Sequence, residues 1–98
     1  MPRPRRHRRV KYCPDICYFK PAGIPKRLLE EVNLKVEEFE ALRLKDYREL
    51  DQKECAKKMN VSQSTFHRLL SVARKKITES IVEGKAVRIE GGIYQIKK

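Results

Sequence analysis

The stretch DQKECAKKMNVSQSTFHRLLSVARKK, residues 51–76, predicts two helices joined by a tight turn. Asp51 with Glu54 three residues later is a variant of the capping box, in which both side chains bind backbone N–H groups of the first turn. Asn60 tolerates the left-handed conformation that commonly ends a helix, and Ser62 is a typical N-cap residue. The stretch therefore contains signals for two helix starts and for the turn between them.

Each of the two expected helices has an apolar face at helical spacing, the pattern of a helix that packs on a core. In the first helix this face consists of Cys55, Ala56 and Met59. In the second helix the apolar residues recur every three or four positions and are Phe66, Leu70, Ala73, Ile77 and Ile81. Val61 is expected to be buried in the corner between the helices.

The opposite face of the second helix is polar or cationic, as a helix that enters a DNA groove requires. Its residues are Gln63, Ser64, Thr65, His67, Arg68, Ser71, Arg74 and Lys75. Gln63 is suited to bidentate pairing with adenine, and Arg68 to contact with a guanine or a phosphate. We expect Ser62, Ser64 and Thr65 to hold the helix start on phosphate. Further phosphate contacts are expected from Lys57, Lys58, Arg74, Lys75 and Lys76.

The net charge is +11 over 98 residues, and it is unevenly distributed. Residues 1–19 carry six Arg or Lys and one acidic residue, and residues 20–50 carry seven of each. Residues 51–98 carry eleven basic and five acidic residues. The excess positive charge thus falls on the N-terminus and on the helix pair with its tail. Nucleic acid is the natural partner of such a distribution, although a basic chain can also simply be soluble and adhesive.

The length allows one small domain with a modest core. No apolar run approaches the length that spans a bilayer, and no apolar stretch follows the basic N-terminus as a secretory signal would require. The odd count of three Cys argues against a disulfide framework and favours a reducing compartment. We therefore expect a cytoplasmic, nucleoid-associated protein without membrane contact.

Residues 1–9, MPRPRRHRR, are expected to form a flexible basic arm in front of a single domain over residues 10–98. Its two prolines suppress a helix, and its arginines repel one another. The arm would lie on phosphates or insert Arg3, Arg5 and Arg6 into a narrow minor groove. A solubilising tail and a tail that binds RNA are the alternatives.

Cys13 and Cys17 raise the question of a metal site, because zinc is commonly held by four Cys or His ligands. The further candidates His7, Cys55 and His67 fit poorly, since they fall in the arm, in an apolar face and in the polar face of the second helix. No second close pair exists, so the two cysteines are interpreted as small apolar side chains. Neither a metal nor another cofactor is predicted.

Residues 36–50, VEEFEALRLKDYREL, predict a helix that supports the pair, because this segment has no net positive charge. Its inner face is expected to consist of Val36, Phe39, Leu42 and Tyr47. The clustered acidic residues are interpreted as a solvated face rather than as acid–base carboxylates. They are Glu37, Glu38 and Glu40. No catalytic residue is predicted.

The C-terminal segment AVRIEGGIYQIKK predicts a small β-hairpin over residues 86–97. Gly91-Gly92 lies between two runs of alternating apolar residues, as a type I′ or II′ hairpin turn requires. Two strands alone are marginal, and Val10–Tyr12 or Ile16–Phe19 would supply a third. The hairpin would either touch the DNA backbone like a wing or only cap the core. Its basic residues are Arg88, Lys97 and Lys98.

The helix pair matches the spacing of helix-turn-helix proteins, in which a Gln, a small residue and a turn residue follow one another at intervals of four. The matching positions are Gln52, Ala56, Asn60, Val61, Phe66 and Leu69. The phrase ECAKKMNVSQSTFHRLLSVARKKI is similar to the fourth region of bacterial sigma factors and to related response-regulator modules. This resemblance implies a close helix crossing at Ala56 and a second helix that lies in the major groove.

Nearly the whole chain resembles the uncharacterised protein family (UPF) 0251, small prokaryotic proteins to which DNA binding is ascribed. The resemblance is carried by MPRPRRHRRV, FKPAGIP, VEEFEALRLKDYREL, ECAKKMNVSQSTFHRLLSVARKKI and GKAVRIEGGIY. It implies the helix-turn-helix fold without naming a target. Asn60 stands where the family usually has Gly, and Gln63 where it often has Arg. The second difference bears on base preference and not on the fold.

Together these patterns predict a mainly α helix-turn-helix domain with a small C-terminal β-hairpin. The expected helices span residues 36–50 (support), 51–60 (first of the pair) and 62–83 (recognition). We expect a non-enzymatic protein that binds specific sequences in double-stranded DNA and regulates transcription. The sequence is compatible with a homodimer and shows no small-molecule effector site. The alternatives are a protein-interaction module of the transcription machinery and an RNA-binding protein that uses the basic arm.

Overall fold

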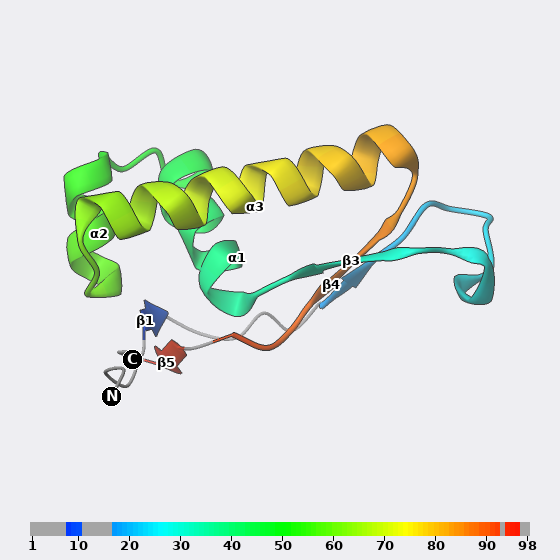
Figure 1. Ribbon diagram of the computed structural model, residues 1–98, viewed down its shortest axis with the longest axis horizontal. Helices are drawn as coiled ribbons and strands as arrows, with labels where there is room; N and C mark the ends of the chain where they lie inside the picture. The colour runs from blue at the N-terminus through cyan, green and yellow to red at the C-terminus, as the bar shows by residue number, and fades with distance from the viewer. Residues whose placement is uncertain (1–7, 11–16, 93, 97–98) are drawn as a thin grey trace, which may run out of the picture.

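The longest element is α3 (Gln63–Glu83), and the other elements are arranged along it (Figure 1). The computed structural model describes residues 8–10, 17–92 and 94–96. The remaining elements are β1 (Arg8–Val10), β2 (Tyr18–Phe19), the 3₁₀ turn η1 (Lys26–Leu28), β3 (Glu31–Leu34), α1 (Val36–Leu42), the π-type turn η2 (Arg43–Tyr47), α2 (Gln52–Met59), β4 (Ala86–Ile89) and β5 (Tyr94–Ile96). The expected mainly α fold with a small β part is confirmed.

α2 and α3 form the predicted helix-turn-helix. Asp51 and Ser62 cap their helices, because each side-chain oxygen accepts a hydrogen bond from the backbone N–H three residues later, at 2.8 and 3.1 Å. Asn60 ends α2 in the left-handed conformation, with φ at 58°. The N–H of Val61 then donates to Ala56 O at 3.0 Å and closes the turn.

Two groups of buried apolar side chains anchor α3. The first joins it to α2 and consists of Ala41, Leu44, Cys55, Ala56, Met59, Phe66 and Leu70. The second joins it to the strands and consists of Val10, Leu34, Val36, Ala73, Val87 and Ile89. The apolar faces expected of α2 and of the first half of α3 are therefore confirmed, and burial of these faces sets the rotation of α3 about its axis.

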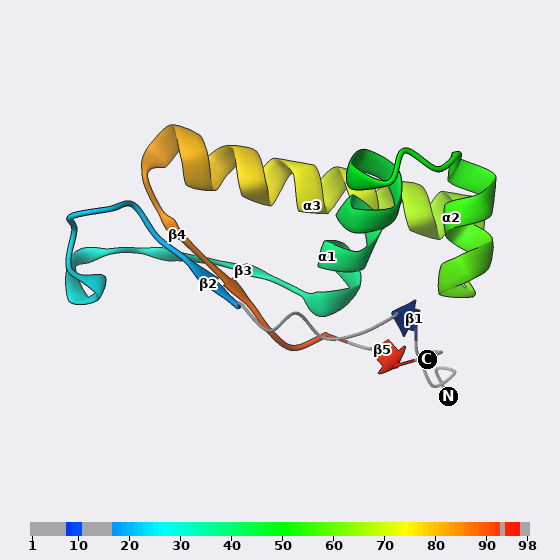
Figure 2. The same cartoon turned by 180° about the vertical axis from the view of Figure 1, so that it is seen from behind.

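β4 is the central strand of a small sheet in the order β2-β4-β3. It runs antiparallel to β2, with Tyr18 opposite Arg88, and parallel to β3, with Val32 opposite Val87. β1 and β5 form a separate parallel pair, which lies below α1 in both views (Figures 1 and 2). Strands from the two ends of the sequence thus lie side by side near the helix pair.

The predicted hairpin over residues 86–97 is wrong. β4 and β5 flank the two glycines, but each strand pairs with other strands and not with its neighbour. Gly91 O instead accepts a hydrogen bond from Val36 N at 3.2 Å, so the chain continues past the start of α1. Gly92, with φ at 99°, passes so close to the Glu37 carboxylate that a Cβ atom would collide with it. Gly92 therefore permits a close backbone approach to α1, and the two glycines do not form a chain reversal.

The glutamates of α1 are buried, so their interpretation as a solvated face is wrong. Glu37, Glu38 and Glu40 are only 3%, 4% and 4% exposed. Each forms an ion pair, and the pairs are Glu37 with Arg8 at 3.3 Å, Glu38 with Lys76 at 2.7 Å and Glu40 with Arg43 at 2.6 Å. Burial is tolerated because β1, α3 and η2 each bring a cation to this acidic face.

Two side chains expected on inner faces are exposed instead, Tyr47 at 84% and Ile81 at 76%. Tyr47 ends the π-type turn η2, whose wider turn rotates its side chain away from the apolar face of α1. Near the end of α3 the inner position belongs to Ser80, whose hydroxyl donates to Lys85 O at 2.8 Å. Ile81 consequently projects into solvent.

Candidate nucleic-acid interface

The outer side of α3 presents the polar and cationic side chains that the sequence predicts for it. The exposed residues are Ser62, Gln63, Ser64, His67, Arg68, Ser71, Arg74 and Lys75, and Thr65 is half-buried. Phe66, Leu70 and Ala73 are buried on the opposite side of the same helix. The buried side chains thus fix which residues of α3 face outward.

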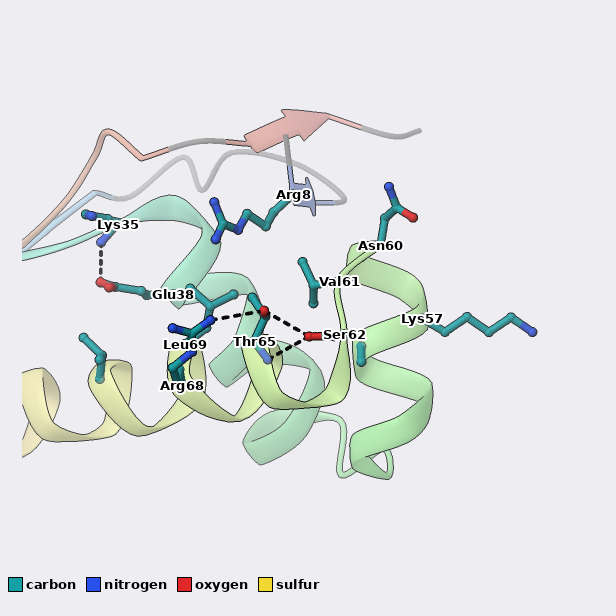
Figure 3. Close-up of a pocket in the computed structure, with 12 residues that line it drawn as sticks. Arg8, Lys35, Glu38, Lys57, Asn60, Val61, Ser62, Thr65, Arg68 and Leu69 are labelled. Atoms are coloured by element: carbon teal, nitrogen blue, oxygen red, sulfur yellow. Dashed lines mark hydrogen bonds between the residues drawn. The ribbon is translucent and has the colours of Figure 1, made fainter. Parts of the chain in front are cut away.

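Hydroxyl groups gather at the start of α3. Ser62 Oγ lies 3.0 Å from Thr65 Oγ1 and 3.2 Å from Ser64 Oγ, and Arg68 Nη2 lies 3.4 Å from Thr65 Oγ1. Figure 3 shows Thr65 between Ser62 and Arg68. A helix start also carries backbone N–H groups without helical acceptors and the positive end of the helix dipole. The start of α3 therefore offers donors that suit an anion.

Several predicted phosphate-binding cations have no carboxylate within ion-pair distance among the residues that the structure describes. They are Lys57, Lys58, Arg68 and Lys75. All four are exposed. Their positive charge is therefore available to an external anion.

Arg74 and Lys76 differ, because both bind carboxylates of the protein. Arg74 makes a bidentate contact with Asp46, at 3.0 Å from Nε and 2.6 Å from Nη2, and this guanidinium lowers the pKa of Asp46. Lys76 Nζ donates to Glu38 Oε1 at 2.7 Å. The expectation that Lys76 contacts phosphate is thus not supported, and Arg74 would first have to leave Asp46.

Two residues of the predicted arm lie in a strand. Arg8 and Arg9 lie in β1, where they pair with Tyr94 and Gln95 of β5, so their assignment to a flexible arm is wrong. The expectation that the segment around Val10 adds a strand to the C-terminal segment is confirmed, because Val10 pairs with Ile96 of β5. Arg3, Arg5 and Arg6 lie outside the described residues, as do Lys97 and Lys98.

Arg88, the remaining basic residue of the expected wing, is also held within the protein. Its guanidinium lies 3.0 Å from both carboxylate oxygens of Glu31 and 4.8 Å from the centre of the Tyr18 ring. These contacts stabilise the β2-β4-β3 sheet. They favour a structural role for Arg88 over a DNA contact.

A hollow of about 970 Å³ flanks the start of α3, and we call it the α3 hollow (Figure 3). It lies between β1, the start of α1 and the helix-turn-helix. Its polar lining includes Arg8, Lys35, Lys57, Ser62, Thr65 and Arg68. The sequence did not single out Arg8 or Lys35 as site residues, because only the folded chain brings β1 and the start of α1 beside α3.

The cysteines lie in different surroundings. Cys55 is fully buried in the core between α2 and α3, and this burial raises the pKa of its thiol. Cys17 is exposed, and Cys13 lies outside the described residues. Within residues 8–10, 17–92 and 94–96, no three His, Cys, Asp or Glu side chains gather as a metal site would require. In the same part of the chain, no helix combines the length and apolarity of a membrane span.

Comparison with known families decides the relationship of this chain. A family model described as protein of unknown function DUF134 matches residues 1–97. The chain belongs to this family. The match covers every element of the DUF134 chain described above, including the helix-turn-helix and both strand groups.

Individual relatives of this DUF134 member are UPF0251 proteins, which confirms the resemblance inferred from the sequence. One from Halothermothrix orenii is 58% identical over 98 residues, covering 100% of this chain and 73% of the relative. Another from Moorella thermoacetica is 54% identical over 96 residues, covering 98% and 64%. A third, from Caldanaerobacter subterraneus subsp. tengcongensis, is 54% identical over 96 residues, covering 98% and 81%. No solved structure matches the chain significantly.

Proposed function

We propose that this protein binds specific sequences in double-stranded DNA and regulates transcription, with α3 in the major groove. The observation that carries the proposal is the two-sided character of α3. Its inner side is anchored by buried apolar residues, and its outer side exposes hydrogen-bonding and cationic side chains. A helix held in this way can meet base edges without losing its own packing.

The residues have separate roles in this proposal. Gln63 pairs with adenine, and Arg68 contacts a guanine or a phosphate. Ser62, Ser64 and Thr65 hold the helix start on the backbone. Phosphate contacts come from three lysines, Lys57, Lys58 and Lys75. Each of these contacts is worth about 0.9 units in the dependence of log affinity on log salt.

Selection of bound duplexes from a random pool, followed by salt titration of the winning sequence, tests the proposal. A single enriched motif with a steep salt dependence is expected. Enrichment of no motif, with equal binding to all duplexes, would contradict sequence-specific recognition. RNA bound as tightly as DNA, with no effect of Gln63→Ala, would favour the RNA-binding alternative.

A protein-interaction module is the second candidate, and an apolar groove favours it. The groove measures about 810 Å³ and lies between the second half of α3, α1 and the β2-β4-β3 sheet. The exposed apolar side chains that line it are Phe19, Tyr47 and Ile81. Absence of salt-dependent binding to any duplex, together with capture of a purified sigma factor or polymerase subunit, would favour this candidate.

The apolar groove is compatible with DNA binding if a second copy of the chain occupies it. Such a homodimer would present two α3 helices to a palindromic site. Sedimentation equilibrium is expected to give a dimer that Ile81→Glu dissociates. DNA binding of this kind implies association with the nucleoid.

A further inference from the structure

The α3 hollow brings cations together from four separate segments of the chain. Arg8 comes from β1, Lys35 precedes α1, Lys57 belongs to α2 and Arg68 to α3. Figure 3 shows Arg8 extending across the hollow and Lys57 pointing outward from its rim. Among the described residues that line the hollow, Glu38 is the only one with a carboxylate. The described side chains of the lining therefore carry more positive than negative charge.

The charge of Glu38 is already balanced by other groups. Its carboxylate accepts hydrogen bonds from Lys76 Nζ at 2.7 Å and from the Lys35 backbone N–H at 3.0 Å. It is 4% exposed and lies beneath the surface of the hollow. The cationic side chains that line the hollow consequently need not neutralise it.

One of these cations is held in place by the fold. Arg8 Nε lies 3.3 Å from the buried Glu37 carboxylate, and β1 is fixed by its pairing with β5. A guanidinium has more donors than a single carboxylate uses, so Arg8 keeps N–H groups for a second acceptor. Lys35 is exposed on the same side. Ser62 and Thr65 line the same hollow from the start of α3, where their hydroxyls lie beside each other (Figure 3).

We propose that the α3 hollow binds phosphodiester groups of the DNA strand that borders the groove occupied by α3. This inference rests on the proposed DNA-binding function. The hollow is wide and open to solvent, and its cations are spread over several elements. These features suit an extended backbone better than a small anion, which is usually enclosed by its site. Arg68 connects the hollow to the outer face of α3, so one strand can reach both.

The hollow would fix the position of α3 along the DNA. Phosphate contacts set the register and orientation of a recognition helix, whereas contacts with base edges set sequence preference. Arg8 and Lys35 lie on elements outside the helix-turn-helix. β1 and α1 thereby become part of the DNA-binding surface.

The first test compares Lys35→Ala with Arg27→Ala, which removes an equal charge from η1 at the other end of the molecule (Figure 1). Lys35→Ala is expected to weaken binding to all duplexes alike. It should also reduce the slope of log affinity against log salt by about 0.9, so that raising the salt from about 50 to 200 mM costs roughly threefold less affinity than in the wild type. Arg27→Ala is expected to leave the slope unchanged. Equal effects of both variants would overturn the inference.

A second test replaces single phosphates of the selected duplex by neutral methylphosphonates. At one or two adjacent positions, the neutral linkage should lower the affinity of the wild-type protein. The same linkage should leave the affinity of Lys35→Ala unchanged, because that variant already lacks the contact. If the losses of affinity from Lys35→Ala and from the neutral linkage added at every position, the hollow would not be a phosphate site. The proposed function would still stand if Gln63→Ala weakened the preferred duplex as expected. Failure of the wild type to bind any duplex would overturn both proposals.

Inorganic phosphate at constant ionic strength distinguishes a free anion from the DNA backbone. Millimolar phosphate is expected to leave duplex affinity unchanged. Competition that disappears in Lys35→Ala would show that the hollow holds a free anion and would overturn the assignment to the DNA strand.

Discussion

The two halves of α3 lie in opposite electrostatic surroundings. Arg68 in the first half and Lys75 just past the middle of the helix face solvent without a carboxylate partner among the described residues. Beside the second half, Lys85 lies within 4 Å of three carboxylates, at 2.9, 3.3 and 3.7 Å. Arg88 in the adjoining strand is bound to Glu31. Cations without a carboxylate partner among the described residues thus lie from the start of α3 to just past its middle, whereas the cations near its end hold the fold.

This contrast shows what net charge alone does not reveal. A charge of +11 indicates a polyanion partner, but not which cations are free to bind it. The second half of α3 instead exposes apolar side chains, with Ile81 and Val82 both at 76%. Under the proposed function, the first end of α3 would meet DNA, and the second end would be open to a protein partner.

The largest expected effect compares two apolar residues of α3, one in each half. Phe66→Ala removes a fully buried side chain and should lower the free energy of unfolding by about 3–5 kcal/mol. Ile81→Ala alters an exposed side chain and should change it by less than about 0.5 kcal/mol. Urea unfolding followed by circular dichroism measures both. Similar losses would show that the second half of α3 is anchored as firmly as the first.

The next effect concerns the carboxylates that bind α3. Glu38→Gln leaves Lys76 beside a neutral group and should destabilise the fold by about 1–3 kcal/mol. Glu83→Gln, whose side chain is 56% exposed and 3.7 Å from Lys85, is the matched control and should cost less than about 0.5 kcal/mol. An unchanged free energy of unfolding in Glu38→Gln would mean that this buried pair does not stabilise the fold.

Along the outer face of α3, the effects of base contacts and of phosphate contacts should separate. Gln63→Ala and Arg68→Ala are each expected to weaken the preferred duplex by about 1–3 kcal/mol more than random DNA. Lys75→Ala should weaken both duplexes alike and lower the salt slope by about one unit. Fluorescence anisotropy titrations measure these affinities. Identical behaviour of all three variants would refute direct contact of this helix with bases.

Arg74 lies between the two halves and offers a smaller effect. Asp46→Asn releases the Arg74 guanidinium and is expected to raise the affinity for any duplex. The slope of log affinity against log salt should become steeper by about one unit. Glu49→Gln removes the same charge from an exposed neighbour and controls for net charge. An equal gain in both variants would mean that Arg74 makes no new phosphate contact.

The smallest effect is acid sensitivity at the second half. Hydrogen bonds from Arg88 and then from Tyr18 lower the pKa of Glu31 to about 2 from its ordinary 4.5. Because the pKa is lower in the folded than in the unfolded state, the pair stabilises the fold above pH 4.5 and loses its contribution as the pH falls toward 2. Glu31→Gln should therefore show a smaller drop in Tm over this range. An unchanged drop would mean that other carboxylates govern acid unfolding.

The sequence alone determined the helix-turn-helix and the polar face of α3. The caps at Asp51 and Ser62, the left-handed Asn60 and the apolar spacing of α3 act over a few residues, so they can be recognised without knowledge of the rest of the chain. Ile81 and Tyr47 followed the same periodicity but proved exposed, because a π-type turn and the return of β4 change which positions face inward.

Only the tertiary structure decided which charges are buried, paired or free. Cations from β1, α3 and η2 pair with Glu37, Glu38 and Glu40. No local sequence pattern predicts these partners. The same holds for Gly91-Gly92, which meets α1 instead of turning back, and for Arg8 and Lys35 beside α3. A sequence states the kinds of side chain available, whereas the fold brings distant segments together and so determines what each charge contacts.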